Sequence, residues 1–121
     1  MGLTVPDAKR TAVAIPESFP VGTIDFSVRL QHKVEFKDIN TPRSKAKPRG
    51  MHGCEIWMKL GDPEPKEASE LDFVATSTRT PYKVEFTGAD VGKTVHYWLR
   101  WINKKGKPGP WSSPINAMVV G

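Results

Sequence analysis

The sequence predicts an all-β, antiparallel sandwich of seven short strands. Two observations lead to this prediction: polar and apolar residues alternate with a period of two in several short runs, and proline and glycine separate those runs. The chain contains 11 prolines and 10 glycines, and no stretch keeps a helical period. Short alternating strands that follow one another without helices indicate two packed antiparallel sheets.

The chain of 121 residues is long enough for one domain with a hydrophobic core. Residues 1–20 contain three prolines and no usable apolar period, which predicts a flexible N-terminal arm or linker. The sandwich is therefore expected over residues 21–121. Because such an arm often connects a domain to a preceding segment, the chain is expected to be part of a longer protein.

The first half of the domain contains two clear alternating runs. In "VRLQHKVEFK", residues 28–37, every second side chain from Val28 to Phe36 is apolar or histidine, and the others are charged or glutamine. This pattern predicts a half-buried strand. A polar loop, residues 38–53, leads to "CEIWMKL", residues 54–60. In that run Cys54, Ile56, Met58 and Leu60 share the predicted core face, and Glu55, Trp57 and Lys59 share the other.

The second half of the domain continues the pattern. "GDPEPKEASE", residues 61–70, predicts a turn region with one helical turn. The remaining strands are expected within "LDFVAT" (71–76), "PYKVEF" (81–86), "TVHYWLRWIN" (94–103) and "SSPINAMVV" (112–120).

Residues 82–120, and more loosely the region from 21, resemble a fibronectin type III domain. Gly92 matches the glycine of the corner before the long strand, Asn103 the asparagine that ends this strand, Gly106 the hairpin glycine, and Ser113 the serine that opens the last strand. Across residues 53–113, stretches such as "GCEIWMK", "TPY" and "GPWS" look like the C-terminal domain of bacterial proteins of unknown function. The resemblance implies an immunoglobulin-like fold and says little about function.

Two departures limit what the resemblance implies. The family places a tyrosine three residues after the corner glycine, but this position holds Val95, and Tyr97 follows on the same face. Either Tyr97 secures the corner or the corner is held otherwise. The hairpin reads "KKGKPGP" and lacks the Arg-Gly-Asp sequence of integrin ligands, so cell adhesion is not implied.

The alternation in the long strand, residues 94–103, separates core-facing from outward-facing side chains. Val95, Tyr97, Leu99 and Trp101 are predicted to face the core, and Trp111 to cover one end of it. His96, Trp98, Arg100 and Ile102 should point outward, with Trp57 of the neighbouring strand close by.

Two interpretations of the outward residues are open. Trp57, Trp98 and Arg100 form a stacked structural ladder, or together with Ile102 they form a partner interface. We take the interface as the leading hypothesis, with a protein partner: a second copy of the chain, or a neighbouring domain of a longer chain.

The alternative site is basic, and the chain carries 18 basic and 13 acidic residues. The loop after the second strand and the hairpin after the sixth should meet at one end of the sandwich. Their basic residues are Arg43, Lys45, Lys47, Arg49, Lys104, Lys105 and Lys107. Such an end suits an anionic polymer, nucleic acid included, or an acidic partner, although a solvated loop end is the commoner role of such charges.

An enzyme is not expected. His52 and the single cysteine, Cys54, lack a third orienting group, and Cys54 is expected in the core. His32 and His96 are predicted to lie too far away to complete a zinc site, so neither a metal nor another cofactor is expected. The sequence contains no signal peptide and no apolar run of about 20 residues such as a membrane helix needs, so no membrane partner and, by default, a cytoplasmic location are expected.

Overall fold

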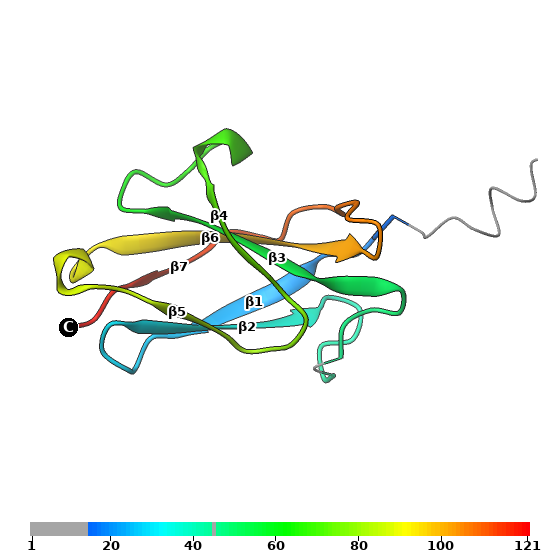
Figure 1. Cartoon of the computed structure of the whole chain (residues 1–121), viewed down its shortest axis with the longest axis horizontal. Coiled ribbons are helices and arrows are strands. Elements are labelled where there is room, and N and C mark those ends of the chain that lie inside the picture. The colour runs from blue at the N-terminus through cyan, green and yellow to red at the C-terminus, as the bar shows by residue number, and fades with distance from the viewer. Residues whose placement is uncertain (1–14, 45) are drawn as a thin grey trace, which may run out of the picture.

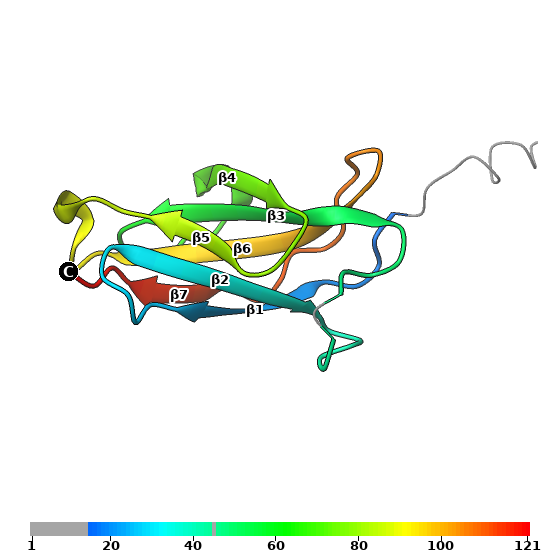
Figure 2. The same cartoon turned by 60° about the horizontal axis from the view of Figure 1, so that its bottom comes forward.

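The computed structural model describes residues 15–44 and 46–121, which form two antiparallel β-sheets packed face to face (Figures 1 and 2). The strands are β1 Pro20–Asp25, β2 Gln31–Asp38, β3 Met51–Leu60, β4 Asp72–Ser77, β5 Tyr82–Glu85, β6 Thr94–Asn103 and β7 Ile115–Met118. Two single 3₁₀ turns are present, η1 Ala68–Glu70 and η2 Gly88–Asp90. Most of the predicted arm, residues 1–14, and Lys45 lie outside the described residues.

The topology is that of an immunoglobulin-like, fibronectin type III-like sandwich. One sheet has the strand order β1-β2-β5 and the other β4-β3-β6-β7, and every printed pairing is antiparallel. The chain crosses between the sheets after β2, after β4 and after β5, whereas β1 and β2, β3 and β4, and β6 and β7 pair within one sheet. This arrangement confirms the predicted fold class.

Strand β6 supplies the centre of the core and has the predicted bounds. Val95, Tyr97, Leu99 and Trp101 are each at most 1% exposed. They pack with Val34 and Phe36 of the facing sheet, and the Phe36 and Trp101 rings meet edge to face with centroids 5.8 Å apart. Burial of a large apolar side chain contributes on the order of 1.5–3 kcal/mol, so this row is a main source of stability.

A buried carboxylate ties the start of the domain to this core. Asp38 Oδ1 accepts hydrogen bonds from Trp101 Nε1 at 2.9 Å and from Ser18 Oγ at 2.5 Å. Pro16 is buried, and a Cβ atom added at Gly109 would lie 2.6 Å from Pro16 Cβ. Residues 15–20, the described part of the predicted arm, therefore pack on the sandwich.

The predicted strand over residues 28–37 starts later than the pattern suggested. Leu30 has a φ of 59°, and β2 begins after it at Gln31. Val28 is 44% exposed and belongs to the β1–β2 turn. Leu30 instead links two other segments, since its N–H donates to Val120 O and its carbonyl accepts from Phe86 N–H. The backbone conformation of the turn, rather than the alternation of side chains, therefore determines where β2 begins.

The corner before β6 is held without a tyrosine. Gly92 has a φ of 86°, and its N–H donates to Val119 O at 2.9 Å, while Thr87 N–H donates to the Asp90 carboxylate. Tyr97 is used elsewhere: its hydroxyl lies 2.8 Å from Nδ1 of the fully buried His32. The other ring nitrogen, Nε2, lies 2.9 Å from Met118 O. Because a carbonyl only accepts, Nε2 carries the proton of neutral His32 and Nδ1 accepts from the Tyr97 O–H.

This arrangement predicts acid-sensitive stability. Burial lowers the pKa of His32 below its ordinary value of 6.5, partly offset by the Met118 carbonyl. Below 6.5 the unfolded chain therefore takes up a proton that the folded chain resists, and stability is lost as the pH falls from 6.5 towards the folded pKa. Urea unfolding between about pH 7.5 and 5.5 should show this decline.

The His32→Gln variant should be less stable near pH 7 and should show a smaller decline with acid. His52→Gln is the matched control because His52 is exposed, and it should keep the wild-type decline. An equal decline in wild type and His32→Gln would contradict the assignment.

Candidate functional site

The outer side of the four-stranded sheet carries most of the predicted interface residues. In the β3–β6 register Trp57 pairs with Trp98, and Glu55 pairs with Arg100. Paired residues of antiparallel strands point to the same side, so these four side chains share the outer face. We call them, together with Phe73 and Trp111, the aromatic face.

Arg100 lies at the centre of the aromatic face. Its guanidinium carbon is 4.2 Å from the Trp111 ring centroid and 5.7 Å from that of Trp57. Its Nε donates to Glu55 Oε1 at 2.6 Å, and Trp57 Nε1 donates to the same oxygen at 3.2 Å. The side chains of Arg100 and Glu55 are only 22% and 17% exposed. The cation is therefore both stacked and ion-paired, as in the ladder interpretation.

Trp111 does not cover the end of the core as predicted. The next residue, Ser112, pairs with β6, since its N–H donates to Leu99 O at 2.7 Å and its Oγ accepts from Leu99 N–H at 3.0 Å. This pairing holds the segment beside β6, and the Trp111 ring lies on the outer side of the sheet. It meets Trp98 edge to face with centroids 5.5 Å apart, and Trp57 at 6.2 Å.

Phe73, which the sequence analysis did not single out, extends the aromatic face towards the β4 edge. Its ring centroid lies 5.2 Å from that of Trp57, and the residue is 51% exposed. In the β3–β4 register Phe73 pairs with Trp57. The one available signal was weak, because the short run 71–76 contains a single large aromatic residue.

Two residues predicted to point outward are buried. Ile102 is 6% exposed, next to a hairpin that returns with an isolated bridge to Pro108, so it offers little surface to a partner. His96 is 5% exposed, and its Nε2 lies 3.1 Å from Asp62 Oδ1 in the β3–β4 connection. In both cases a connecting segment places atoms near the sheet, which strand parity alone does not reveal.

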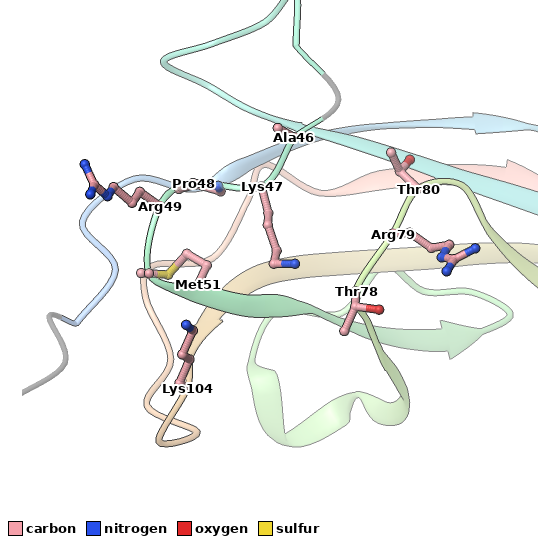
Figure 3. Close-up of a pocket in the computed structure, with 10 residues that line it drawn as sticks. Ala46, Lys47, Pro48, Arg49, Met51, Thr78, Arg79, Thr80 and Lys104 are labelled. Atoms are coloured by element: carbon pink, nitrogen blue, oxygen red, sulfur yellow. The ribbon is translucent and has the colours of Figure 1, made fainter.

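The two segments that carry the basic residues, the β2–β3 connection and the hairpin after β6, lie at one end of the sandwich, opposite the C-terminus (Figure 1). Lys47, Arg49 and Lys104 line a common cavity with Arg79 of the β4–β5 connection, which the sequence analysis missed (Figure 3). Arg43, Lys105 and Lys107 are exposed on the same two segments. Lys45 lies outside the described residues.

The residues weighed for catalysis are kept apart. Cys54 is fully buried, and desolvation raises the pKa of its thiol well above the ordinary value, whereas His52 is exposed. His32 lies in the opposite sheet. Within the described residues, no three His, Cys, Asp or Glu side chains are grouped as metal ligands would be, and no helix is long and apolar enough to cross a membrane.

Comparisons with known proteins support the fold. The structure matches one titled "Myokine structure" with a TM-score of 0.59 and 14% identity, over 88% of this chain and 100% of that one. It also matches "Titin kinase and its flanking domains" with a TM-score of 0.52 and 17% identity, over 84% of this chain and 17% of that one. No protein-family model and no curated protein matches the sequence. At these identities the likeness shows an immunoglobulin- or fibronectin type III-like fold alone, a fold that is typically non-catalytic.

The stacked guanidinium predicts a stabilising role for Arg100. Arg100→Gln should lower the free energy of unfolding by about 1–3 kcal/mol, because two cation–π contacts and a charged hydrogen bond in a half-buried site are lost. Urea denaturation measures the change. Arg79→Gln is the control, since Arg79 is exposed and forms no ion pair within the described residues, and it should stay within about 0.5 kcal/mol of wild type. Equal effects of the two substitutions would contradict the ladder.

Proposed function

We propose that this chain is a non-catalytic assembly module that associates with a second copy of itself through the aromatic face. Domains of this fold commonly act as binding or assembly modules. We choose a second copy of the chain as the partner because of how charge is distributed over the molecule. The chain has a net charge of +5, so most approaches between two copies are repulsive.

Charge cancellation on the outer side of the four-stranded sheet is the observation that carries this proposal. Within the described residues, two ion pairs join a Lys or Arg to a carboxylate, Arg100–Glu55 and Lys59–Glu70, and His96 Nε2 lies 3.1 Å from Asp62 Oδ1. Arg100 and Glu55 both point to this side, from β6 and β3, and Lys59 points to it from β3. A locally neutral face can meet its own copy without like-charge repulsion, as a two-fold symmetric interface requires.

The rigidity of the aromatic face favours binding as well. Trp and Arg are the residues most enriched among those that dominate interface energies. Here the Trp111 ring packs edge to face against Trp57 and Trp98 and stacks on Arg100, so little side-chain freedom remains to be lost on contact. Phe73, half exposed at the β4 edge, supplies the apolar area that a second copy would cover.

Sedimentation velocity tests the proposal. The wild-type chain should sediment with a concentration-dependent mass rising to twice 13.5 kDa. Phe73→Ser should raise the dissociation constant at least about tenfold, because it removes exposed ring area without disturbing the core. Trp98→Ser should also raise the dissociation constant, by at least the same factor.

Phe26→Ser is the matched control. Phe26 is 47% exposed, close to the 51% of Phe73, but lies in the turn between β1 and β2 of the other sheet. It should leave the association unchanged. A wild-type chain that remains monomeric up to about 1 mM would overturn the proposal, as would equal weakening by the Phe26 and Phe73 substitutions.

A further inference from the structure

A cavity of about 600 Å³ opens at the basic end of the sandwich. Three segments far apart in sequence form it: residues 46–51 before and at the start of β3, residues 78–80 between β4 and β5, and Lys104 just after β6. Figure 3 shows Lys47 reaching down from the first segment and Lys104 reaching up from the last, while Arg49 and Arg79 extend to the two sides. The cavity is independent of the aromatic face, with which it shares no residue.

The charge in this cavity is uncompensated. Its lining includes four cationic side chains, Lys47, Arg49, Arg79 and Lys104, and no carboxylate. Within the described residues none of these four forms an ion pair, whereas Arg100 of the aromatic face and Lys59 of β3 are both paired. Like charges gathered at one end repel one another, and a bound anion would relieve that repulsion.

The backbone around the cavity is fixed even though the cationic side chains are exposed. Asn103 Oδ1 accepts hydrogen bonds from the N–H groups of Lys105 and Lys107, both at 2.9 Å, which shapes the hairpin that follows Lys104. Ser77 Oγ donates to Arg79 O, and Met51 N–H donates to Pro48 O at 3.1 Å. The cationic residues thus lie on or beside hydrogen-bonded turns, so binding would restrict only the conformations of their side chains.

The lining also indicates the chemistry of the ligand. Ammonium and guanidinium groups only donate, and the exposed Thr78 hydroxyl adds another donor, so the cavity suits tetrahedral oxyanions such as phosphate and sulfate. No aromatic side chain lines the cavity, so it offers no ring for stacking a nucleobase. Four cations in one cavity suit a ligand with several anionic groups in a row.

We propose that this cavity binds a short polyanionic chain through its phosphate or sulfate groups, without reading bases. Lys47 and Lys104 contact the polyanion from opposite sides. The guanidinium groups of Arg49 and Arg79 each donate two hydrogen bonds to one of its oxyanion groups. The site is a second binding function, separate from assembly through the aromatic face.

Isothermal titration calorimetry with inorganic tripolyphosphate and with a heparin-derived hexasaccharide tests this site. Both should bind at low salt, and the affinity should fall steeply when NaCl is raised from about 20 mM to about 200 mM. The double variant Lys47→Gln/Arg79→Gln should weaken binding of both at least about tenfold. Binding of one probe but not the other would identify phosphate or sulfate as the natural group and would still support the site.

The control is Arg29→Gln/Lys93→Gln, which removes one exposed arginine from the β1–β2 turn and one exposed lysine from the segment between η2 and β6. Both segments lie at the opposite end of the sandwich (Figure 1). It changes the net charge by the same amount, so it should bind nearly as wild type does. Equal weakening by the two double variants would overturn the site, because binding would then follow net charge alone. A single-stranded oligothymidylate that binds much more tightly than either probe would also overturn it, in favour of a nucleic-acid surface that reads bases.

Discussion

Alternate side chains of strand β6 point to two different surfaces, the core and the aromatic face. A shift of the strand register by one residue would exchange the two sets of side chains. Val95, Leu99 and Trp101 enter the core, whereas Trp98 and Arg100 join the aromatic face. Because the side-chain period of a strand is two, the register between β3 and β6 fixes both surfaces at once. The sandwich, the Arg100 ladder and the proposed interface all depend on that single register.

The polar groups inside the sandwich reinforce this register. Asp38 of β2 receives the Trp101 N–H across the core, and His32 of the same strand receives the Tyr97 hydroxyl. A buried polar group without a partner costs about 1–3 kcal/mol, so alternative pairings of the two sheets are penalised. These contacts also specify the fold more narrowly than apolar packing does, since they require particular atoms rather than a volume.

The two candidate binding surfaces differ in how their charges are used. On the aromatic face Arg100 is ion-paired with Glu55, and the neighbouring Lys59 is ion-paired with Glu70, so this side of the sheet carries little net charge, which suits a contact with an identical surface. At the basic end the cations lie on loops without ion-pair partners in the described chain, which suits a mobile, charged ligand. The two proposed binding surfaces of this chain, whose net charge is +5, therefore share no residue.

Alternation and turn residues by themselves predicted the antiparallel sandwich, the approximate position of most strands and the burial of Trp101, because these depend on local periodicity. Only the tertiary structure decided where connecting segments lie: Trp111 turned onto the outer face because Ser112 pairs with Leu99, and Ile102 and His96 are buried beside returning loops. Arg79 joined the basic cavity for the same reason. Contacts between segments distant in sequence leave no periodic signal in either segment. The sequence therefore pointed to most residues of both surfaces, but it could not show that Trp111 and Arg79 belong to them or that Ile102 does not.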